Sequence, residues 1–429
     1  MAAQDPVAKS DRPTDDFHAT GPETPAGQYL RRHWQPIYHV ADLPRARPVP
    51  VRIMGQDFVL YRGDGGAAHL LDARCPHRGM QLSSGWIEGE CLRCFYHGWM
   101  FDPTGQCVEQ PAEDSEFAHK VQIGGYPTEE YLGLVFAWLG GGAPPPLPRF
   151  PDFERFEGVV EIDSYRRDCN YFQNVENALD MSHVAFVHGD NRAAFREIGR
   201  GRDLHAEESE WGISYTFTRA DGKYRTQQFG MPNAYNLTAL PTDADIGWQE
   251  SLFWWVPVDD LHHIQFSIHR VPVTGAAAER VHQRRQARRK TIDTDHNRVS
   301  LDMLAGRLGV EDLDTERVDM IRLQDDIAQI GQGRIADRTA ERLGRGDVGV
   351  IMIRRLWTRE LQALADGNPL KNWTRTPDIV PEAWGLRGTP AIGPANGSGG
   401  GDAPDTPLVD VRPYVEIDSQ LELLGGRVS

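Results

Sequence analysis

The chain has few cysteines, no long apolar run and a deficit of positive charge. Five cysteines among 429 residues are too sparse for a disulfide-stapled scaffold. No segment approaches the roughly 18 consecutive apolar residues that a membrane-spanning helix needs, and the N-terminus lacks the apolar stretch of a secretory signal. We therefore expect a cytoplasmic protein that does not bind membranes. Lysine and arginine number 46 against 62 aspartates and glutamates, and the net charge of −16 disfavours nucleic acid as a partner.

The length and the residue pattern predict an α+β protein. A chain of 429 residues has room for two or three domains. Over residues 1–45 we expect a polar arm that contains a short helix over 28–34. Residues 46–145 alternate apolar and polar positions in short runs divided by Gly and Asp, which is typical of an all-β domain. The glycine and proline run over 140–146 ends this pattern, because neither a helix nor a central strand accommodates it.

Residues 146–429 form the second expected domain, in which both kinds of element occur. We expect helices over 169–186 and within 279–345, strands over 215–218, 235–240 and 264–271, and a linker over 388–407. Gly344, Gly346 and Gly349 match the pattern G-x-G-x-x-G. They follow a charged segment that is expected to be helical, and not a strand. We therefore predict a turn that ends a helix there, and no nicotinamide or flavin site in this chain.

Two cysteines and two histidines lie in a pair of matching segments. Cys75 and His77 stand in the first, and Cys94 and His97 follow in the second after a gap of sixteen residues. This set suits a [2Fe–2S] cluster in which one iron takes both thiolates and the other takes both imidazoles, which raises the reduction potential. Zinc and incidental residues are the alternatives, but zinc fingers pair Cys with Cys and His with His. The remaining cysteines, which we expect to be small buried residues, are Cys91, Cys107 and Cys169.

These segments resemble the two Rieske loops of ring-hydroxylating oxygenases. The match reads CPHRG over 75–79 and CFYHGW over 94–99. The resemblance extends over nearly the whole chain, from residues 28–36 to Arg354 and Arg355. It implies a Rieske domain followed by a helix-grip catalytic domain with an antiparallel sheet. It also implies the phthalate-dioxygenase-like branch of the family, which assembles as a homotrimer or as two stacked trimers.

A second set of polar residues lies over 170–188. Asn177, Asp180 and His183 recur at intervals of three and would form one stripe on a helix. His183 and His188 are five residues apart, or about 140° on a regular helix, so both reach one metal only if the helix ends or bulges between them. Two histidines and one carboxylate are the ligands of non-haem Fe(II) oxygenases. Two unrelated histidines are the alternative, but an upstream electron-transfer cluster needs an acceptor.

The family resemblance implies roles for these residues. His183 and His188 match the iron-ligating histidines of the oxygenases. Asp180 matches the acid that links an iron-bound histidine to the Rieske histidine of a neighbouring subunit, and Asn177 joins it as a candidate catalytic residue.

The third ligand is expected to be a carboxylate within residues 322–338. The match to this segment assigns Asp325. Helical periodicity alone favours Asp326, which lies on the edge of the apolar stripe, and Asp337 is a further alternative.

The resemblance also implies a reaction. A terminal oxygenase of this kind uses O₂ and electrons from a separate NADH-dependent flavin and iron–sulfur reductase, directly or through a ferredoxin. Residues 92–113 resemble O-demethylases of lignin-derived biaryls such as dehydrodivanillate, which release formaldehyde. Ring hydroxylation of another aromatic acid, as in phthalate-type dioxygenases, is the alternative, and a Rieske electron-transfer protein without oxygen chemistry is an alternative of another class. Candidate pocket residues, each with core packing as its alternative, are Phe172, Phe186, His205, Met231, Asn233 and Trp254.

Overall fold

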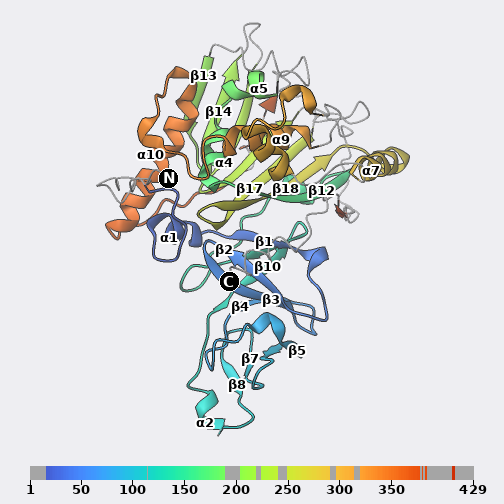
Figure 1. The fold of residues 1–429 in the computed structure, drawn as a ribbon, viewed down its shortest axis with the longest axis vertical. Coiled ribbons are helices and arrows are strands. Elements are labelled where there is room, and N and C mark those ends of the chain that lie inside the picture. Colours follow the sequence, from blue (N-terminus) through green and yellow to red (C-terminus); the bar gives the residue numbers. More distant parts are fainter. Residues whose placement is uncertain are drawn as a thin grey trace.

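The structure is a computed structural model, and two parts follow one another along its long axis (Figure 1). It describes residues 16–113, 115–188, 203–218, 224–239, 249–289, 296–313, 319–376, 379, 382–383 and 408–410. The linker expected over 388–407 lies outside these residues. One part is small and rich in short strands. The other is built on one broad sheet that carries most of the helices, so the expected α+β class is confirmed.

The small part contains three sheets of short strands. The first has the order β2 (Val49–Ile53), β3 (Gln56–Arg62), β4 (Ala68–Asp72) and β9 (Gly125–Tyr126). The second has the order β5 (Trp86–Glu88), β6 (Cys91–Arg93), β7 (Met100–Phe101) and β8 (Cys107–Glu109). The third joins β1 (Gln35–His39), β11 (Leu134–Ala137) and β10 (Thr128–Tyr131). Leu71, Leu82, Leu92 and Phe101 form a core of their own between the first two sheets.

The large part is organised by one sheet, in which all neighbouring strands are antiparallel except β12 and β20. Its order is β13 (Asp203–Glu208), β14 (Gly212–Thr218), β15 (Tyr224–Gly230), β16 (Ala234–Ala239), β17 (Gln249–Asp259), β18 (His262–Val271), β12 (Val159–Arg167) and β20 (Leu408–Asp410), with β19 (Glu382–Ala383) beside β15. Alternate residues point to opposite faces. Trp254 of β17 packs on Phe136 and Phe150, toward the small part.

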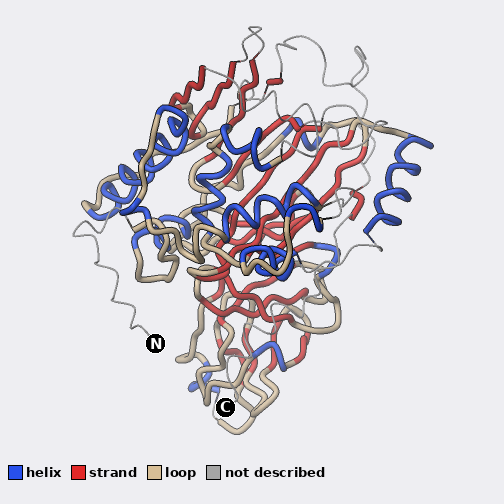
Figure 2. The backbone as a smooth tube through the Cα atoms, turned by 45° about the horizontal axis from the view of Figure 1, so that its top comes forward, coloured by secondary structure: helices blue, strands red, loops and turns tan. Residues whose placement is uncertain are grey.

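Helices cover the other face of the large sheet (Figure 2). They are α4 (Tyr171–Ala178), α5 (Ser182–Val187), α9 (Met320–Ile330) and α10 (Val348–Ala365), and α1 (Pro25–Arg31) packs against α10. The remaining α-helices in the described residues are α2 (Ser115–Ala118), α3 (Pro151–Glu154), α7 (Gly275–Arg289) and α8 (His296–Leu304). Trp357 of α10 is completely buried among the rings of Phe17, Tyr29 and Phe172. This packing ties the N-terminal helix to the helical layer.

The helix expected over 169–186 is two helices, which corrects the single stripe expected for Asn177, Asp180 and His183. The first helix ends at Ala178 and the second begins at Ser182. Asp180 Oδ1 accepts a hydrogen bond from the Ser182 backbone N–H at 2.8 Å. A side chain that bonds to the backbone two residues ahead competes with the helical hydrogen bond, so the chain turns here.

Two other expected boundaries also differ from the structure. The first helix begins at Pro25 rather than at residue 28, because Thr24 caps it and proline suits its first position. The glycines expected to end a helix instead begin one, since Gly344 caps a 3₁₀ turn over Arg345–Asp347 that contains Gly346 and leads into α10. Gly349 lies in the first turn of α10, where a Cβ would come within 2.2 Å of the Leu179 carbonyl oxygen.

Candidate active site

The two Cys–His segments fold as a matched pair of loops. The Cys75 backbone N–H donates to Met80 O at 2.8 Å, and the Cys94 N–H donates to Trp99 O at the same distance. Gly79 and Gly98 follow the two histidines with φ values of +72° and +73°, a conformation that favours glycine. The loops therefore share one backbone design, which places their side chains face to face.

The side chains of these loops suit an iron–sulfur cluster. Cys75 and Cys94 are each 1% exposed, and burial together with Cys94 raises the pKa of the Cys75 thiol to about 12. Two adjacent buried thiols are the inner half of a cluster site, because bound iron would take them as thiolates. His77 and His97 are exposed at the tip with their ring centroids 4.4 Å apart. Thiols inside and imidazoles outside match the asymmetric ligand set of a Rieske centre.

The other three cysteines lie away from the loop tip. Cys107 and Cys169 are completely buried, whereas Cys91 is half-buried on β6, so the expectation of burial holds for two of the three. All five cysteines are free.

The structure brings His183, His188 and Asp325 together on the helical side of the large sheet. One ligand atom from each lies within 4.8 Å of the others. Asp325 Oδ1 is 3.3 Å from His188 Nε2 and 3.7 Å from His183 Nε2. Helix α5 ends at Val187 and His188 is its C-cap, so the helix stops between the two histidines. This ending allows both rings to face one point.

Polar neighbours bond to two members of this group, His188 and Asp325. His188 Nδ1 lies 2.9 Å from Gln324 Oε1, and Asn177 Nδ2 donates to Asp325 Oδ1 at 3.2 Å. Asp180 Oδ2 is 3.8 Å from His183 Nδ1, which is longer than a hydrogen bond. That nitrogen is buried without a hydrogen-bond partner. The Asp180 carboxylate therefore lies beside the His183 ring but does not accept a hydrogen bond from its Nδ1.

The pKa values of the two histidines shift in opposite directions: that of His183 is lowered by burial, whereas that of His188 is raised because Asp325 outweighs burial. Burial lowers the pKa of His183, which keeps the imidazole neutral and able to ligate. Burial would raise the pKa of Asp325, but the hydrogen bond and charge of His188 outweigh it and lower the pKa to about 2. An ionised carboxylate between two imidazoles is the ligand set of a mononuclear iron with open positions.

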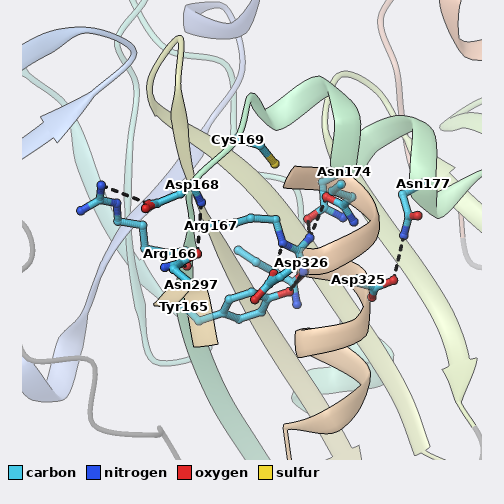
Figure 3. Close-up of polar contacts among 12 residues, drawn as sticks. Tyr165, Arg166, Arg167, Asp168, Cys169, Asn174, Asn177, Asn297, Asp325 and Asp326 are labelled. Carbon is cyan, nitrogen blue, oxygen red and sulfur yellow. Dashed lines mark hydrogen bonds and ion pairs between the residues drawn. The ribbon is translucent and has the colours of Figure 1, made fainter. Parts of the chain in front are cut away.

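Asp326 points away from the histidines, although helical periodicity favours it as a ligand. It is completely buried and pairs with Arg167, which is also completely buried (Figure 3). Arg167 also donates to Asn174 Oδ1, to Gln329 Oε1 at 2.8 Å and to the Tyr165 hydroxyl at 2.6 Å. The apolar edge position of Asp326 is therefore explained by a buried ion pair.

Asp337 also lies away from the histidines. It is exposed and caps a 3₁₀ turn through Thr339.

The candidate pocket residues do not gather at this site. Phe172 stacks on Phe17, Asn233 bonds to Gln35, and Trp254 faces the small part. Met231 is buried beside a cis bond to Pro232. Phe186 and His205 are strongly exposed.

The sequence analysis assigned no role to Gln324 or Arg167. Gln324 precedes Asp325 directly, and this adjacency was the available signal. The partner of Arg167 lies 159 residues away, so local periodicity gave no sign of it.

Comparison with known proteins identifies both parts. The model of the Rieske [2Fe-2S] domain matches residues 33–129, and that of the vanillate O-demethylase oxygenase C-terminal domain matches residues 167–230. The 5,5'-dehydrodivanillate O-demethylase oxygenase subunit of Sphingobium sp. is 32% identical over 395 residues, which cover 85% of this chain and 83% of the relative. The chain belongs to the Rieske non-haem iron oxygenases.

Other members of this family are similarly related. The phthalate 4,5-dioxygenase oxygenase subunit of Pseudomonas putida is 28% identical and matches 80% of this chain and 84% of its own length. The terminal oxygenase of carbazole 1,9a-dioxygenase from Novosphingobium sp. KA1 has the same fold, with a TM-score of 0.59, 21% identity, and coverage of 85% of this chain and 99% of that one.

This Rieske oxygenase is a terminal oxygenase component. Its cofactors are a [2Fe–2S] cluster and a mononuclear iron. The alternative of an electron carrier without oxygen chemistry is therefore wrong. Within the described residues, no helix is both long and apolar enough to cross a membrane.

Proposed function

We propose that His183, His188 and Asp325 hold the mononuclear iron. The observation that supports this assignment is the convergence of their ligand atoms within 4.8 Å from two helices that are separated by well over a hundred residues. These three residues would hold the iron, which would supply the chemistry of O₂ activation when bound. The chain itself orients the ligands, because Gln324 fixes the ring of His188 and Asn177 fixes the carboxylate of Asp325.

The ligands of the [2Fe–2S] cluster are also assigned from residues that the fold brings together. We assign Cys75, His77, Cys94 and His97 to the [2Fe–2S] centre, because the two loops have matching backbones, buried thiols and exposed imidazoles. We also propose that the chain is divided into an N-terminal arm over 1–45, a Rieske domain over 46–145 and a catalytic domain over 146–429.

The two metal sites are far apart within one chain. Figure 1 shows β5, β7 and β8 at one end of the molecule, while α5 and α9 lie in the other part. The Cys–His loops lie between β4 and β5 and between β6 and β7. We propose that the protein assembles as a homotrimer, alone or stacked in pairs, so that the cluster of one subunit meets the iron site of the next. Asp180 then holds the His183 Nδ1 proton on one side and faces the exposed His77 or His97 of that neighbour.

We propose that the electron donor is an NADH-dependent flavin and iron–sulfur reductase, with or without a ferredoxin. Complexes of the carbazole oxygenase with a ferredoxin support a protein donor. Five free cysteines fit the reducing cytoplasm, where we place the protein.

The reaction that we propose is O-demethylation of a methoxylated, lignin-derived aromatic similar to dehydrodivanillate. One oxygen atom of O₂ enters a C–H bond of the methoxy group, and the resulting hemiacetal breaks down to a phenol and formaldehyde; the other atom leaves as water. The relative that acts on dehydrodivanillate and the vanillate O-demethylase domain match support this choice. Ring hydroxylation of another aromatic acid is the second candidate, supported by the phthalate dioxygenase relative.

A substrate screen distinguishes the two candidates. The oxygenase is supplied with NADH and a compatible reductase, and formaldehyde and hydroxylated rings are measured in parallel for methoxylated and methoxy-free aromatic acids. We expect one formaldehyde for each methoxy group lost. Diol or phenol from a methoxy-free acid, with formaldehyde from none of the methoxyarenes, would contradict the demethylase assignment.

A further inference from the structure

An arginine precedes each of the two Cys–His loops and bonds to the far end of that loop. Arg74 precedes Cys75, and its Nη1 donates to the Gly79 carbonyl oxygen at 3.3 Å. In the second loop, Arg93 donates from its Nη1 to the Gly98 carbonyl oxygen at 2.8 Å. Each arginine therefore joins the residue before the cysteine to the glycine after the histidine, so the two loops share this side-chain bond as well as their backbone bonds.

Arg93 uses every donor that its guanidinium has. Its Nε and Nη2 donate to the two carboxylate oxygens of Glu88 at 2.7 and 2.8 Å. Its Nη1 and Nη2 donate to the two carboxylate oxygens of Glu109 at 3.2 and 2.9 Å. With the bond to Gly98, these are five bonds for the five N–H groups of an arginine side chain. The planar fork is therefore fixed in one orientation.

The two carboxylates reach Arg93 from other strands of the sheet that contains β5 to β8. Trp86 of β5 lies opposite Arg93 of β6, and Glu88 is two residues further along β5. Met100 of β7 lies opposite both Arg93 and Glu109. Side chains that are two residues apart on a strand, or directly opposite across two strands, share one face of a sheet. The register therefore presents both carboxylates to the guanidinium on the same face.

The exposure of this group indicates a role other than stability. The side chains of Glu88 and Glu109 are 42% and 47% exposed, whereas that of Arg93 is 12% exposed. Hydrogen bonds from Arg93 lower the pKa of Glu88 to about 2 and also lower the pKa of Glu109, so both carboxylates are ionised at neutral pH. Exposed ion pairs contribute little to folding stability, but several bonds on one guanidinium fix its position. That fixed position serves the Gly98 carbonyl, which is the acceptor that belongs to a Cys–His loop.

We propose that Arg93 positions the second Cys–His loop, so that Cys94 and His97 keep the geometry that the [2Fe–2S] centre requires. Gly98 follows His97 directly and has a φ of +73°, a conformation that a glycine adopts without a side chain to restrain it. The bond from Arg93 holds the peptide that this glycine leaves free to turn. Arg74 has the same role at the first loop, with a longer bond from an exposed side chain. This inference rests on the proposed assignment of the cluster ligands.

The charge of Arg93 gives a second measurable effect. Reduction adds one electron to the centre, and the charges nearby set how favourable that addition is. Arg93 carries one positive charge between two carboxylates, so its loss would leave two negative charges beside the loop. Loss of both carboxylates would leave the positive charge instead. The first change disfavours reduction and the second favours it, whereas a purely structural disturbance has no such dependence on sign.

The test compares variants of the full-length enzyme with both metals loaded. The rate at which bathophenanthroline removes the cluster iron and the reduction potential of the Rieske centre are measured for each. Arg52→Met is the matched control, because it also removes one positive charge from the small part, from an arginine that pairs with an aspartate of the neighbouring strand. The variants compared with it and with the wild type are Arg93→Met, Arg93→Lys, Arg74→Met and the double variant Glu88→Gln with Glu109→Gln.

We expect Arg93→Met to lose cluster iron about ten-fold faster than the wild type. Its equilibrium constant for one-electron reduction should fall about ten-fold, which is about 59 mV. Arg93→Lys should lie between the two, because it keeps the charge without the fork, and Arg74→Met should be affected less than Arg93→Met. The double glutamine variant should also lose iron faster, but with a raised potential. Arg52→Met should stay within about two-fold of the wild type in rate.

Two results would overturn the proposal. One is a wild-type rate of iron loss in Arg93→Met or in the double glutamine variant. The other is a shift of the potential in the same direction in both. If Arg93→Met does not fold, the double glutamine variant still decides, because it keeps the arginine and removes only the exposed carboxylates that hold it.

Cys94→Ser separates this inference from the assignment of the cluster ligands. A Cys94→Ser variant that keeps the Rieske absorption would contradict the ligand assignment, whatever the substitutions of Arg93 do. If Cys94→Ser lacks the cluster while Arg93→Met and the double glutamine variant retain iron as the wild type does, the ligand assignment stands and the positioning role is contradicted.

Discussion

At the scale of single residues, Asp180 is the side chain on which electron transfer between subunits depends in this account. Its Oδ2 lies 3.8 Å from His183 Nδ1, while its Oδ1 bonds to the Ser182 N–H. We predict that Asp180→Asn keeps both metals but lowers kcat by about 100-fold, because the amide keeps the size of the side chain and loses the charge that holds the imidazole proton. Steady-state kinetics with iron and sulfide analysis measure this.

Asp337→Asn is the matched control for that variant. Asp337 is exposed and only caps a 3₁₀ turn, so its substitution should leave kcat within about two-fold of the wild type. Normal turnover in Asp180→Asn would show that the carboxylate does not join the two sites.

The residues that spacing predicts are those whose partners are close in sequence. Cys75 with His77 and Cys94 with His97 lie within two short loops, so their pairing is visible in the sequence. Arg167 was not predicted as important, because a lone arginine in a strand carries no local signal. Its role depends on Asp326 of α9, which only the folded chain brings beside it.

At the scale of elements, helix α9 shows why periodicity alone favours Asp326 although Asp325 is the aspartate that lies beside the histidines. Asp326 occupies the inner edge of the helix, where a buried carboxylate needs a cation, and Arg167 provides it. Asp325, one residue earlier, faces the gap between α9 and α5 instead. Periodicity identifies which side of a helix is buried. It does not distinguish a side buried against a sheet from one that faces a metal site.

The ion pair between Arg167 and Asp326 should anchor α9 and so position Asp325. We predict that Arg167→Met lowers the free energy of unfolding by about 3–5 kcal/mol, because it removes the guanidinium that pairs with the completely buried Asp326 carboxylate. The double variant Arg167→Met with Asp326→Leu should recover most of the loss, since it removes both charges. Denaturant unfolding of the four members of this cycle tests the prediction, and a single variant as stable as the wild type would contradict it.

Three strands of the large sheet were predicted from the sequence. The expected strands 215–218, 235–240 and 264–271 correspond to β14, β16 and β18, of which β14 has the alternating burial of a strand with one buried face. The expected helix over 169–186 was wrong in its middle, since the turn at Asp180 is set by one side-chain hydrogen bond. Strands β12, β13, β15 and β17 were not predicted. In β12 and β17 both faces are largely buried, so the alternation of apolar and polar residues is lost.

At the scale of the whole molecule, the separation of the two metal sites implies that one chain alone does not complete the electron path. We predict a mass of about three times 48.2 kDa in solution, or twice that for stacked trimers. Cys75→Ser should lack the cluster and Asp325→Asn should lack the iron, so each alone should be inactive. Co-expressed in mixed trimers they should regain activity, because an intact cluster can then meet an intact iron site. Inactive mixed trimers would contradict transfer between subunits.

The account depends most on a second iron site at His183, His188 and Asp325. The most direct test is the ratio of iron to acid-labile sulfide in the reconstituted enzyme, compared with that of Asp325→Asn. We predict about three irons and two sulfides per chain in the wild type and about two of each in Asp325→Asn, whose Rieske absorption stays unchanged. Two irons per wild-type chain, or three in Asp325→Asn, would contradict the assignment of this site.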